Sequence, residues 1–537
     1  MNTLLINPDH KNTVNNFPWG VLSVGSYLRQ QGRPVRLLDL SNDPGNSNEK
    51  LEEAIKWADL VGIGMFSTDV PVILDIVDRI KSSKPDLSII CGGPHVVLEP
   101  ELTCQYKNVD FVAFGEGEQT IELLISELEK QTPNFDNIPG LIYKSNGMVK
   151  RTYQPSRPVD FYNIDYTLLA PEVRATFGDY IQVLSARGCS FRCTFCYNPV
   201  INQVFRPRPT EGFIPELDKI VAEYDPKVVY FRDENFFEEK QRVRDFIEIY
   251  KAKNYKFRWR ATSRIGYMRE RYIDDKMLKQ LEEINLEIMK FGVESGSQRV
   301  LNFIKKSQRV EWIEEAAQRV SRSKVNGSFS FMIGIPTETF DEYIETIMVL
   351  KDLIDSDKKF EIIGPQYFRL YPGGELYEHA IKEGFIGKPK TLEEYGEVFL
   401  KDRLGTNHYM PYPWIEKKAR HLARYAQWLL YFYSLDNRTL LTPRNWYLLP
   451  LSLMAKLRFK FRWFTYLYEL HIALTLANKL PIIKKILRGT RSWTVGSWRQ
   501  GHESRSSVAA YEEYPSDQTA KKPRSSDIDV EIENMPV

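Results

Sequence analysis

Short apolar runs alternate with amphipathic stretches along most of this 537-residue chain. The first runs predict strands at Thr3–Ile6, Pro34–Leu40, Leu60–Met65, Leu87–Cys91 and Phe111–Phe114, with helices at Val21–Gln31, Leu51–Ala58, Pro71–Ser82 and Thr120–Lys130. Short apolar runs separated by helices are typical of a parallel sheet with helices on both faces. We therefore predict a doubly wound, Rossmann-like α/β domain over residues 1–135.

A second alternation follows a connector, residues 136–179, which is rich in Pro, Asn and Asp and holds a hairpin around Asn146-Gly147. Strands are predicted at Ile181–Ser185, Val228–Phe231, Phe257–Thr262, Glu287–Gly292, Ser328–Ile333 and Ile362–Arg369, with helices such as Arg242–Lys253 and Phe340–Ile354 between them. This pattern fits a partial α/β barrel of the TIM type over residues 180–390. We expect a helical, aromatic C-terminal domain at 391–491 and a disordered tail at 492–537.

Composition excludes several classes of protein. The 73 Lys and Arg balance 71 Asp and Glu, which argues against bulk nucleic-acid binding through a basic surface. Five cysteines in a chain of this length exclude a disulfide-stapled secreted scaffold. The N-terminus lacks the pattern of a secretory signal, and no run reaches the length of a membrane-spanning helix. We expect a soluble, cytoplasmic protein.

Three of the five cysteines, Cys189, Cys193 and Cys196, fall within eight residues directly after the predicted strand Ile181–Ser185. Three thiolates on one loop favour a 4Fe–4S cluster that has one iron without a protein ligand. Zinc is the competing interpretation, but a structural zinc site needs a fourth ligand, and no other Cys or His lies nearby. Three buried structural thiols are a weaker alternative, because such tight clustering is improbable by chance.

The spacing CxxxCxxC after a first strand resembles the radical S-adenosylmethionine (SAM) superfamily. That resemblance implies that Cys189, Cys193 and Cys196 bind the cluster and that SAM chelates the open iron. Electron transfer from the cluster would then cleave SAM to a 5′-deoxyadenosyl radical. The resemblance also implies that Phe195 packs near the adenine.

Further motifs of the superfamily follow in order, over roughly residues 180–387. They are Tyr230–Phe236, Gly292–Gly296, Met332–Pro336 and Pro372–Tyr377. The resemblance implies that Glu294 and Ser295 meet the ribose and methionine of SAM, and that Gly334 and Pro336 pass the adenine. Two departures stand out: Gly374 replaces the usual Thr, and the Gly-Gly-Glu that binds the SAM amino group is missing, with Thr210-Glu211-Gly212 as a weak substitute.

Glycines also end three predicted strands of the first domain, within Val61–Thr68, Cys91–His95 and Phe114–Glu118. Aligned glycines build an edge that a large flat ligand can approach closely. The pattern resembles the cobalamin-binding domain that precedes many radical SAM enzymes. It implies Ser67 and Thr68 beneath the corrin edge and a nucleotide tail lined by Gly92, Gly93, Gly115 and Gly117.

The lower axial histidine of other cobalamin proteins has no counterpart, because Asp9 and His10 are adjacent and their spacing does not match the motif. The resemblance therefore implies base-off cobalamin without a His ligand, or a domain that has lost the cofactor. We expect His95 to be structural or to contact the tail, and Cys91 and Cys104 to be core residues.

The segments Arg420–Ser434 and Leu451–Arg488 are predicted to be helical, aromatic and locally basic. A bundle that packs on the barrel is the simpler interpretation, and peripheral membrane contact through interfacial helices is the alternative. Nucleic-acid binding is not expected, because no stacking motif accompanies the charges.

Together the resemblances imply a cobalamin-dependent radical SAM enzyme that methylates an unactivated carbon of a small-molecule, lipid or tetrapyrrole-like substrate. A flavodoxin or ferredoxin would be the electron donor. Oxidative cyclisation or rearrangement on the same scaffold, as in anaerobic magnesium-protoporphyrin monomethyl ester cyclases, stays open as an alternative. So does a non-catalytic cobalamin-binding sensor.

Overall fold

The computed structural model describes residues 1–8, 17–41, 47–152, 159, 162–200, 204–396, 412–436 and 448–479. The expected tail at 492–537 lies outside these ranges, as do parts of the expected C-terminal domain. Across the described ranges, no helix has the length and apolar character needed to cross a membrane.

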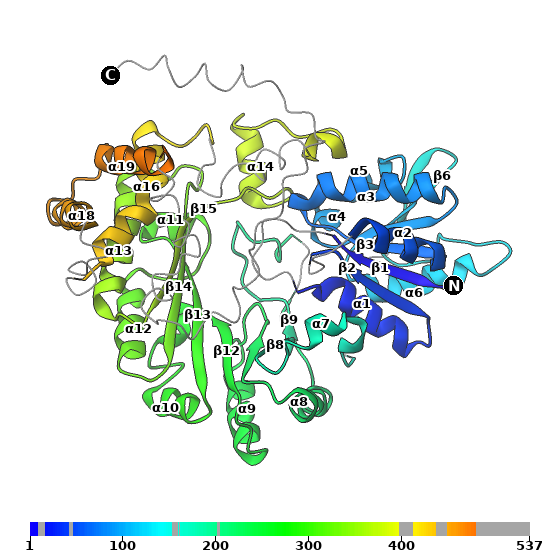
Figure 1. The fold of residues 1–537 in the computed structure, drawn as a ribbon, viewed down its shortest axis with the longest axis horizontal. Helices are drawn as coiled ribbons and strands as arrows, with labels where there is room; N and C mark the ends of the chain where they lie inside the picture. The colour runs from blue at the N-terminus through cyan, green and yellow to red at the C-terminus, as the bar shows by residue number, and fades with distance from the viewer. Residues whose placement is uncertain are drawn as a thin grey trace. The chain divides into compact units, whose positions relative to one another are not determined.

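The N-terminal sheet has seven strands in the order β2-β1-β3-β4-β5-β6-β7 (Figure 1). They span Thr3–Asn7 (β1), Val35–Asp39 (β2), Leu60–Gly64 (β3), Ser88–Gly92 (β4), Phe111–Ala113 (β5), Leu141–Ser145 (β6) and Met148–Arg151 (β7). The first five are parallel, and Gly64 at the end of β3 pairs with Gly92 at the end of β4. The order 2-1-3-4-5 confirms the predicted doubly wound domain.

The predicted hairpin turns at Asn146 and Gly147, which both have positive φ, and β6 pairs antiparallel with β5. The sheet therefore continues past residue 135, where we expected the domain to end.

Helices cover both faces of this sheet. Those of the N-terminal domain are α1 (Trp19–Gln30), α2 (Ser47–Trp57), α3 (Val70–Ser83), α4 (Pro94–Leu98), α5 (Pro100–Gln105) and α6 (Gly117–Leu128), with the short 3-10 helix η1 (Ser67–Asp69). Apolar residues of α1 and α6 share one buried cluster, and those of α2 and α3 share another. Cys91 and Cys104 are buried in the second cluster, as expected of core residues.

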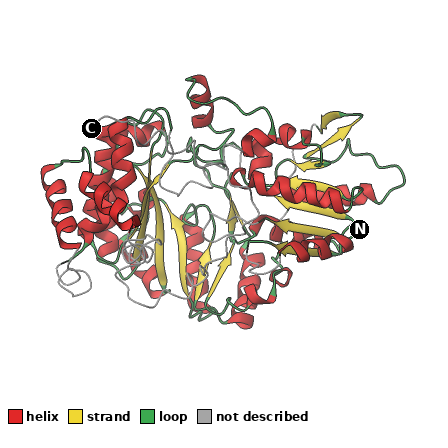
Figure 2. Ribbon diagram, turned by 45° about the horizontal axis from the view of Figure 1, so that its top comes forward, coloured by secondary structure: helices red, strands yellow, loops and turns green. Residues whose placement is uncertain are grey.

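The second sheet has six parallel strands in the order β15-β14-β13-β12-β11-β8, all six predicted from the sequence. They span Tyr180–Val183 (β8), Val228–Phe231 (β11), Arg258–Ser263 (β12), Leu286–Glu294 (β13), Asn326–Ile333 (β14) and Glu361–Tyr367 (β15). Crossover helices include α8 (Thr210–Tyr224), α9 (Lys240–Ala252), α10 (Asp275–Glu283), α12 (Glu311–Ser321) and α13 (Phe340–Ser356). Figure 2 shows these strands flanked by helices. The sheet is open, which confirms the partial barrel.

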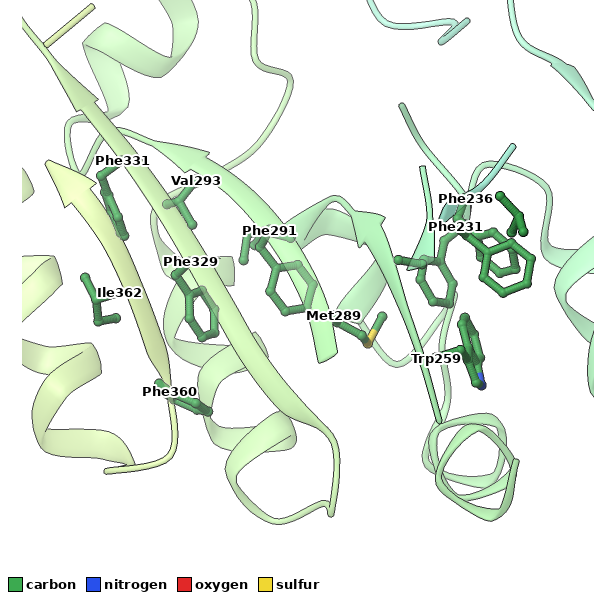
Figure 3. Packing of buried hydrophobic residues seen from close by; sticks show 14 of the residues in the cluster. Phe231, Phe236, Trp259, Met289, Phe291, Val293, Phe329, Phe331, Phe360 and Ile362 are labelled. Carbon is green, nitrogen blue, oxygen red and sulfur yellow. The ribbon is translucent and has the colours of Figure 1, made fainter. Parts of the chain in front are cut away.

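Aromatic side chains fill the space between this sheet and its helices (Figure 3). Phe231 and Phe236 lie with ring centroids 5.6 and 5.3 Å from Trp259, and Phe329 stacks on Phe291 at 5.2 Å. These side chains are almost fully buried. Each buried ring contributes on the order of 2–3 kcal/mol of hydrophobic stabilisation, so the core holds the carboxyl ends of the strands in fixed positions.

Shorter elements complete the barrel region and its surroundings: η2 (Tyr166–Leu168), α7 (Pro171–Arg174), η3 (Ile265–Met268), α11 (Gln298–Phe303) and α14 (Glu375–Lys382). Beyond them α16 (Lys417–Ser434) packs on α13 and β15, and α18 (Leu449–Phe461) and α19 (Tyr468–Lys479) pack on α16. The helical prediction for Leu451–Arg488 is interrupted between α18 and α19, and residues 480–488 lie outside the described ranges.

One buried cluster joins the domains. It contains Leu5 and Leu22 of the N-terminal domain, Phe177 of the connector, Val183 of the barrel and Phe464 of the C-terminal helices. The described residues between Met1 and Lys479 accordingly belong to one compact unit.

Candidate cluster and cofactor site

The three cysteines lie on a loop that is closed at its base by a two-residue ladder. Strand β9 (Ala186–Arg187) precedes this loop and pairs antiparallel with β10 (Arg206–Pro207), which follows it. Gly188 has a φ of 77°, which turns the chain out of β9 into the loop. We call the described residues 188–200 the cysteine loop.

Two acidic residues that follow β11 hold the start of this loop through hydrogen bonds to the backbone. The Asp233 carboxylate accepts hydrogen bonds from the backbone N–H of Ser185 and Ala186 at 2.7 and 2.9 Å, just before the loop. The Glu234 carboxylate accepts from the backbone N–H of Gly188 at 3.1 Å. The acidic pair that was recognised as a motif thus fixes the exit angle of the loop, because each carboxylate satisfies buried backbone donors.

Two side-chain donors approach the cysteine sulfurs. The Arg264 guanidinium lies 3.8 Å from Cys193 Sγ, and the Asn235 amide lies 4.0 Å from Cys189 Sγ. Arg264 also stacks on Phe191 of the loop, with its guanidinium carbon 3.6 Å from the ring centroid. Burial raises the pKa of the Cys196 thiol to about 11 and the pKa of Cys189 above its ordinary value. The raised pKa values disfavour free thiolates at Cys189 and Cys196, whereas donors near sulfur stabilise the negative charge that metal-bound sulfur carries.

The surroundings of the cysteine loop offer polar atoms to a bound ligand. Across the part of the chain that the structure describes, no three His, Cys, Asp or Glu side chains converge closely enough to hold a single metal ion. Three buried polar atoms have no hydrogen-bond partner among the described residues: Thr194 Oγ1 and Asn198 Oδ1 of the cysteine loop, and Asn235 Oδ1, whose amide nitrogen approaches Cys189. Such atoms suit a polar ligand beside the cluster.

Lys306 contacts both Phe195 and Glu294. Glu294 ends β13 with a φ of 73° and forms a largely buried ion pair with Lys306 at 2.7 Å. The Lys306 ammonium lies 5.6 Å from the Phe195 ring centroid. A Cβ on Gly292 would stand 2.4 Å from the Glu294 carboxylate, so glycine leaves room for this pair.

Ser295 faces the protein interior. Its hydroxyl lies 3.1 Å from Thr346 Oγ1 of α13, and a Cβ on the neighbouring Gly296 would stand 2.7 Å from the α13 backbone. The Ser-Gly part of the motif therefore packs β13 onto α13, and a contact between Ser295 and SAM stays a prediction.

Gly334 and Pro336 follow β14 in a buried turn, where Gly334 has a φ of 85°. The Glu338 carboxylate accepts from the backbone N–H of Gly334 at 2.7 Å and of Ile335 at 3.2 Å. Burial raises the pKa of Glu338 to about 8, so its carboxyl is largely protonated at neutral pH. This acid holds the turn that follows β14, and a contact between the turn and adenine stays a prediction.

The Pro372–Tyr377 segment lies against the cysteine loop. Both line one small cleft, to which Phe195 and Cys196 contribute from the loop and Pro372 and Gly374 from the segment. A Cβ on Gly374 would stand 3.5 Å from the carbonyl oxygen of Thr194. Thr210, Glu211 and Gly212, by contrast, are exposed at the start of α8.

At the carboxyl edge of the N-terminal sheet, Ser67 and His95 form a buried pair. His95 Nδ1 lies 2.9 Å from the Ser67 hydroxyl, and its other nitrogen is buried without a partner among the described residues. Burial lowers the pKa of His95 to about 4, so the ring is neutral. Thr68 is half-buried beside this pair. A Cβ on Gly93 would stand 3.0 Å from the Met65 backbone, so this glycine serves the close approach of two strands.

Gly92 ends β4, Gly115 follows β5 and Gly117 begins α6. A Cβ on Gly92 or Gly117 would meet only ordinary contacts beyond 3.5 Å. Gly115 has a φ of 106°, a conformation that side chains disfavour.

A buried ionic network joins this glycine turn to the base of the cysteine loop. Arg187 of β9 lies 3.1 Å from Glu116 and 2.8 Å from Glu118, and Arg206 of β10 also pairs with Glu116. The Tyr162 hydroxyl donates to Glu118 at 2.6 Å. The two edges expected to hold cofactors are thus connected by charge pairs across sheets.

Sequence comparisons identify both domains. The B12 binding domain family matches residues 14–125, and the radical SAM superfamily matches residues 183–350. An uncharacterised methyltransferase of Pyrococcus horikoshii, PH0819, is 30% identical over 381 residues, which are 69% of this chain and 79% of the relative. This chain belongs to the cobalamin-binding radical SAM family. It is a cobalamin-dependent radical SAM enzyme, and its two domains are those that use cobalamin, SAM and a 4Fe–4S cluster.

Other relatives of this radical SAM enzyme cover most of its length. The anaerobic magnesium-protoporphyrin IX monomethyl ester cyclase of Rubrivivax gelatinosus is 22% identical over 453 residues, 78% of this chain and 80% of the relative. The solved structure of the radical SAM methyltransferase TsrM from Kitasatospora setae, with cobalamin and a 4Fe–4S cluster bound, matches with a TM-score of 0.63 at 16% identity. That match covers 82% of this chain and 90% of TsrM, and it shows the shared fold.

Several residues of the radical SAM site were not found from the sequence. Arg264 follows β12 directly, at the edge where the other strands end, and that position was an available signal. Lys306 and the pairs of Arg187 and Arg206 with Glu116 gave no local signal, since 71 residues separate Arg187 from Glu116.

Proposed function

We propose that Cys189, Cys193 and Cys196 bind the 4Fe–4S cluster and that the enzyme methylates an unactivated carbon of a small-molecule substrate. The observation that carries this proposal is the cysteine loop, which β9 and β10 close and Asp233 braces at the carboxyl edge of the barrel sheet. Cluster, SAM and cobalamin together supply radical hydrogen abstraction and methyl transfer when bound, chemistry beyond any side-chain acid or base.

The chain's own residues bind, orient and exclude water in this proposal. The three cysteine sulfurs hold iron, while Arg264 and Asn235 donate toward two of them. Lys306 positions the Glu294 carboxylate near Phe195, where the ribose and amino-acid part of SAM would contact it. Gly334 and Pro336 offer the turn held by Glu338 to the adenine.

For cobalamin we propose the edge formed by Gly92, Gly93, Gly115 and Gly117, with Ser67 and Thr68 beside it. Packing within the chain does not require glycine at positions 92 and 117, where a Cβ would meet only ordinary contacts, and this supports a role in ligand approach. His95 is neutral and bonded to Ser67, which fits a structural or tail-contacting residue and cobalamin without a His ligand.

Methylation is favoured over cyclisation because the 30%-identical relative is named a methyltransferase, whereas the cyclase relatives share 22–23%. A low-potential flavodoxin or ferredoxin is the proposed one-electron donor. The substrate class stays broad in this proposal, and lipid and tetrapyrrole-like molecules are both included.

The test of the cluster is anaerobic reconstitution of the full chain with iron and sulfide. Wild type should show 4Fe–4S absorbance and form 5′-deoxyadenosine from SAM under reductant. The C189A/C193A/C196A variant should do neither, while C104A, which alters a buried cysteine outside the loop, should do both. SAM cleavage by the triple variant would contradict the proposal.

The test of the reaction is product mass after incubation with lipid and tetrapyrrole candidates. A gain of one methyl group supports methyl transfer. Loss of hydrogen or gain of oxygen would assign the cyclase-type alternative. Cobalamin retention without any deoxyadenosine would assign the sensor alternative.

A further inference from the structure

Large apolar side chains gather on the exposed side of α18, on the turn that joins it to α19 and at the start of α19. This apolar surface consists of Leu453, Leu457, Phe461, Trp463, Tyr466, Tyr468 and Ile472, each between 48% and 69% exposed. Leu453, Leu457 and Phe461 are four residues apart and share one helix face. In Figure 1, α18 lies at the outer margin of the C-terminal helices. Contiguous exposed apolar residues mark interaction sites, whereas single ones are ordinary.

The turn between α18 and α19, which carries Trp463 and Tyr466, is held by the buried side chain of Arg458. The Arg458 side chain is buried, pairs with Glu469 at 2.5 Å and donates to the carbonyl oxygen of Trp463 at 2.8 Å and of Tyr466 at 3.1 Å. Arg462 and Tyr466 both have positive φ, which costs on the order of 1 kcal/mol for each such residue. The Tyr466 and Tyr468 rings stack at 5.6 Å. A strained turn that is held by a buried arginine keeps these rings outward, as a preformed contact surface.

Positive charge borders the apolar surface. Three basic residues lie between Leu449 and Tyr468 besides the buried Arg458, which is paired with Glu469: Lys456, Lys460 and Arg462. Lys456 and Lys460 follow each other by one turn of α18, on the side next to the row of Leu453, Leu457 and Phe461. They line a cavity of about 460 Å³ together with Lys351 and Lys358 of the α13 end, over an apolar wall that includes Phe459.

The acids of this cavity are already paired. Asp355 lies 2.8 Å from Lys351, and Asp436 lies 3.6 Å from Lys358. Lys456 and Lys460 have no acidic partner among the described residues within ion-pair distance. The cavity therefore keeps cations available for an anionic group such as phosphate.

We propose that this face docks on the surface of an anionic lipid bilayer, with the apolar surface in the headgroup boundary and a lipid phosphate in the lysine cavity. Tyrosine and tryptophan beside lysine and arginine suit that boundary, where one end of each ring is apolar and the other wet. A second copy of this chain is a less favourable partner for this face. Two such faces in contact would place the lysines of one copy, Lys456 and Lys460, near those of the other, and like charges repel.

The experiment is flotation of the purified full chain with vesicles of phosphatidylcholine alone or of phosphatidylcholine with phosphatidylglycerol. Wild type should float only with the anionic vesicles, and high salt should weaken binding. L457Q/F461Q should abolish flotation. K456Q/K460Q should weaken binding roughly 25-fold, about fivefold for each cation. M148Q alters an exposed apolar residue of β7 and should leave flotation unchanged.

All three variants should cleave SAM as wild type does, so failure here is distinguishable from failure of the proposed chemistry. Absence of flotation by wild type would overturn the proposal, as would equal binding to both vesicles. Sedimentation velocity tests the second copy: a wild-type dimer that becomes monomeric in L457Q/F461Q would assign this face to self-association instead.

Discussion

Replacing Arg187 by methionine tests whether the ionic network fastens the two cofactor edges together. The substitution keeps a long apolar stem but removes the cation that lies 2.8 Å from Glu118 and 3.1 Å from Glu116. Glu118 is 4% exposed and has no other cation within ion-pair distance in the described part of the chain, whereas Glu116 keeps Arg206. The loss therefore falls mainly on Glu118.

Removing one partner of a buried ion pair costs about 3–5 kcal/mol, because the other charge stays buried without compensation. We expect about 3 kcal/mol for R187M, the lower end, since the Tyr162 hydroxyl still donates to Glu118. In wild type, Arg187 and Tyr162 overcome burial and lower the pKa of Glu118. Without Arg187, burial raises it, and an acid with a raised folded pKa loses stability as pH increases. The deficit of R187M should be larger at pH 8 than at pH 5.

Urea titration at both pH values, followed by tryptophan fluorescence, measures this deficit. The double variant R187M/E118Q should recover most of the loss, because it removes the stranded charge. K227M, which breaks a 2.7 Å pair with Asp179 at the surface, should cost less than about 1 kcal/mol. A deficit of R187M as small as that of K227M, or no recovery in the double variant, would refute the reasoning.

Three further predictions concern the radical SAM domain. E338Q keeps an acceptor for the backbone N–H of Gly334 but cannot ionise. Because the pKa of Glu338 in the folded wild type is raised to about 8, wild type loses stability as pH rises from 5 to 8, and E338Q should gain stability relative to it. A difference in urea midpoint that stays constant over this pH range would contradict the prediction. G296A should destabilise by about 1–3 kcal/mol, because its Cβ would meet the α13 backbone at 2.7 Å, whereas G20A in α1 has open space and should be neutral or stabilising in the same thermal unfolding assay. R264M removes a donor to Cys193 Sγ and should lower the reduction potential of the cluster in an EPR-monitored titration, whereas R260M, which alters a half-exposed arginine of β12, should not.

Local patterns predicted most of the fold. All six barrel strands were found because short apolar runs and amphipathic helices have different periods. Asn146-Gly147 also predicted the hairpin turn, since both residues adopt positive φ. The pairing of β6 with β5 was not predicted, because no local signal tells a hairpin which strand edge it will join. The break between α18 and α19 was missed for the same reason, as Arg458 stabilises it through contacts that depend on the folded turn.

The candidate site was predicted as far as its motifs reach. The cysteines, the acidic pair after β11 and the glycine turn after β14 lie on contiguous segments with recognisable spacing. The structure adds contacts between residues that are far apart in the sequence, which motif spacing does not reveal. Lys306 lies between Glu294 and Phe195, and Arg264 lies over Phe191 of the cysteine loop. Ser295 shows that a residue of a recognised motif can also have a packing role, because its hydroxyl contacts Thr346 of α13.

The buried cluster that runs through all three domains limits how the enzyme can move. Tyr166 and Phe177 of the connector pack with Phe17 and Trp19 at the start of α1, and Asp165 bonds to Ser26 and Arg29 of that helix. Swinging the cobalamin-binding domain away would expose these rings at a cost of about 2 kcal/mol each. Phe177 also packs on Tyr224 of α8, with ring centroids 5.2 Å apart, so the connector is anchored to the barrel domain as well. A rigid-body separation of the two domains would therefore have to break buried contacts on both sides of the connector.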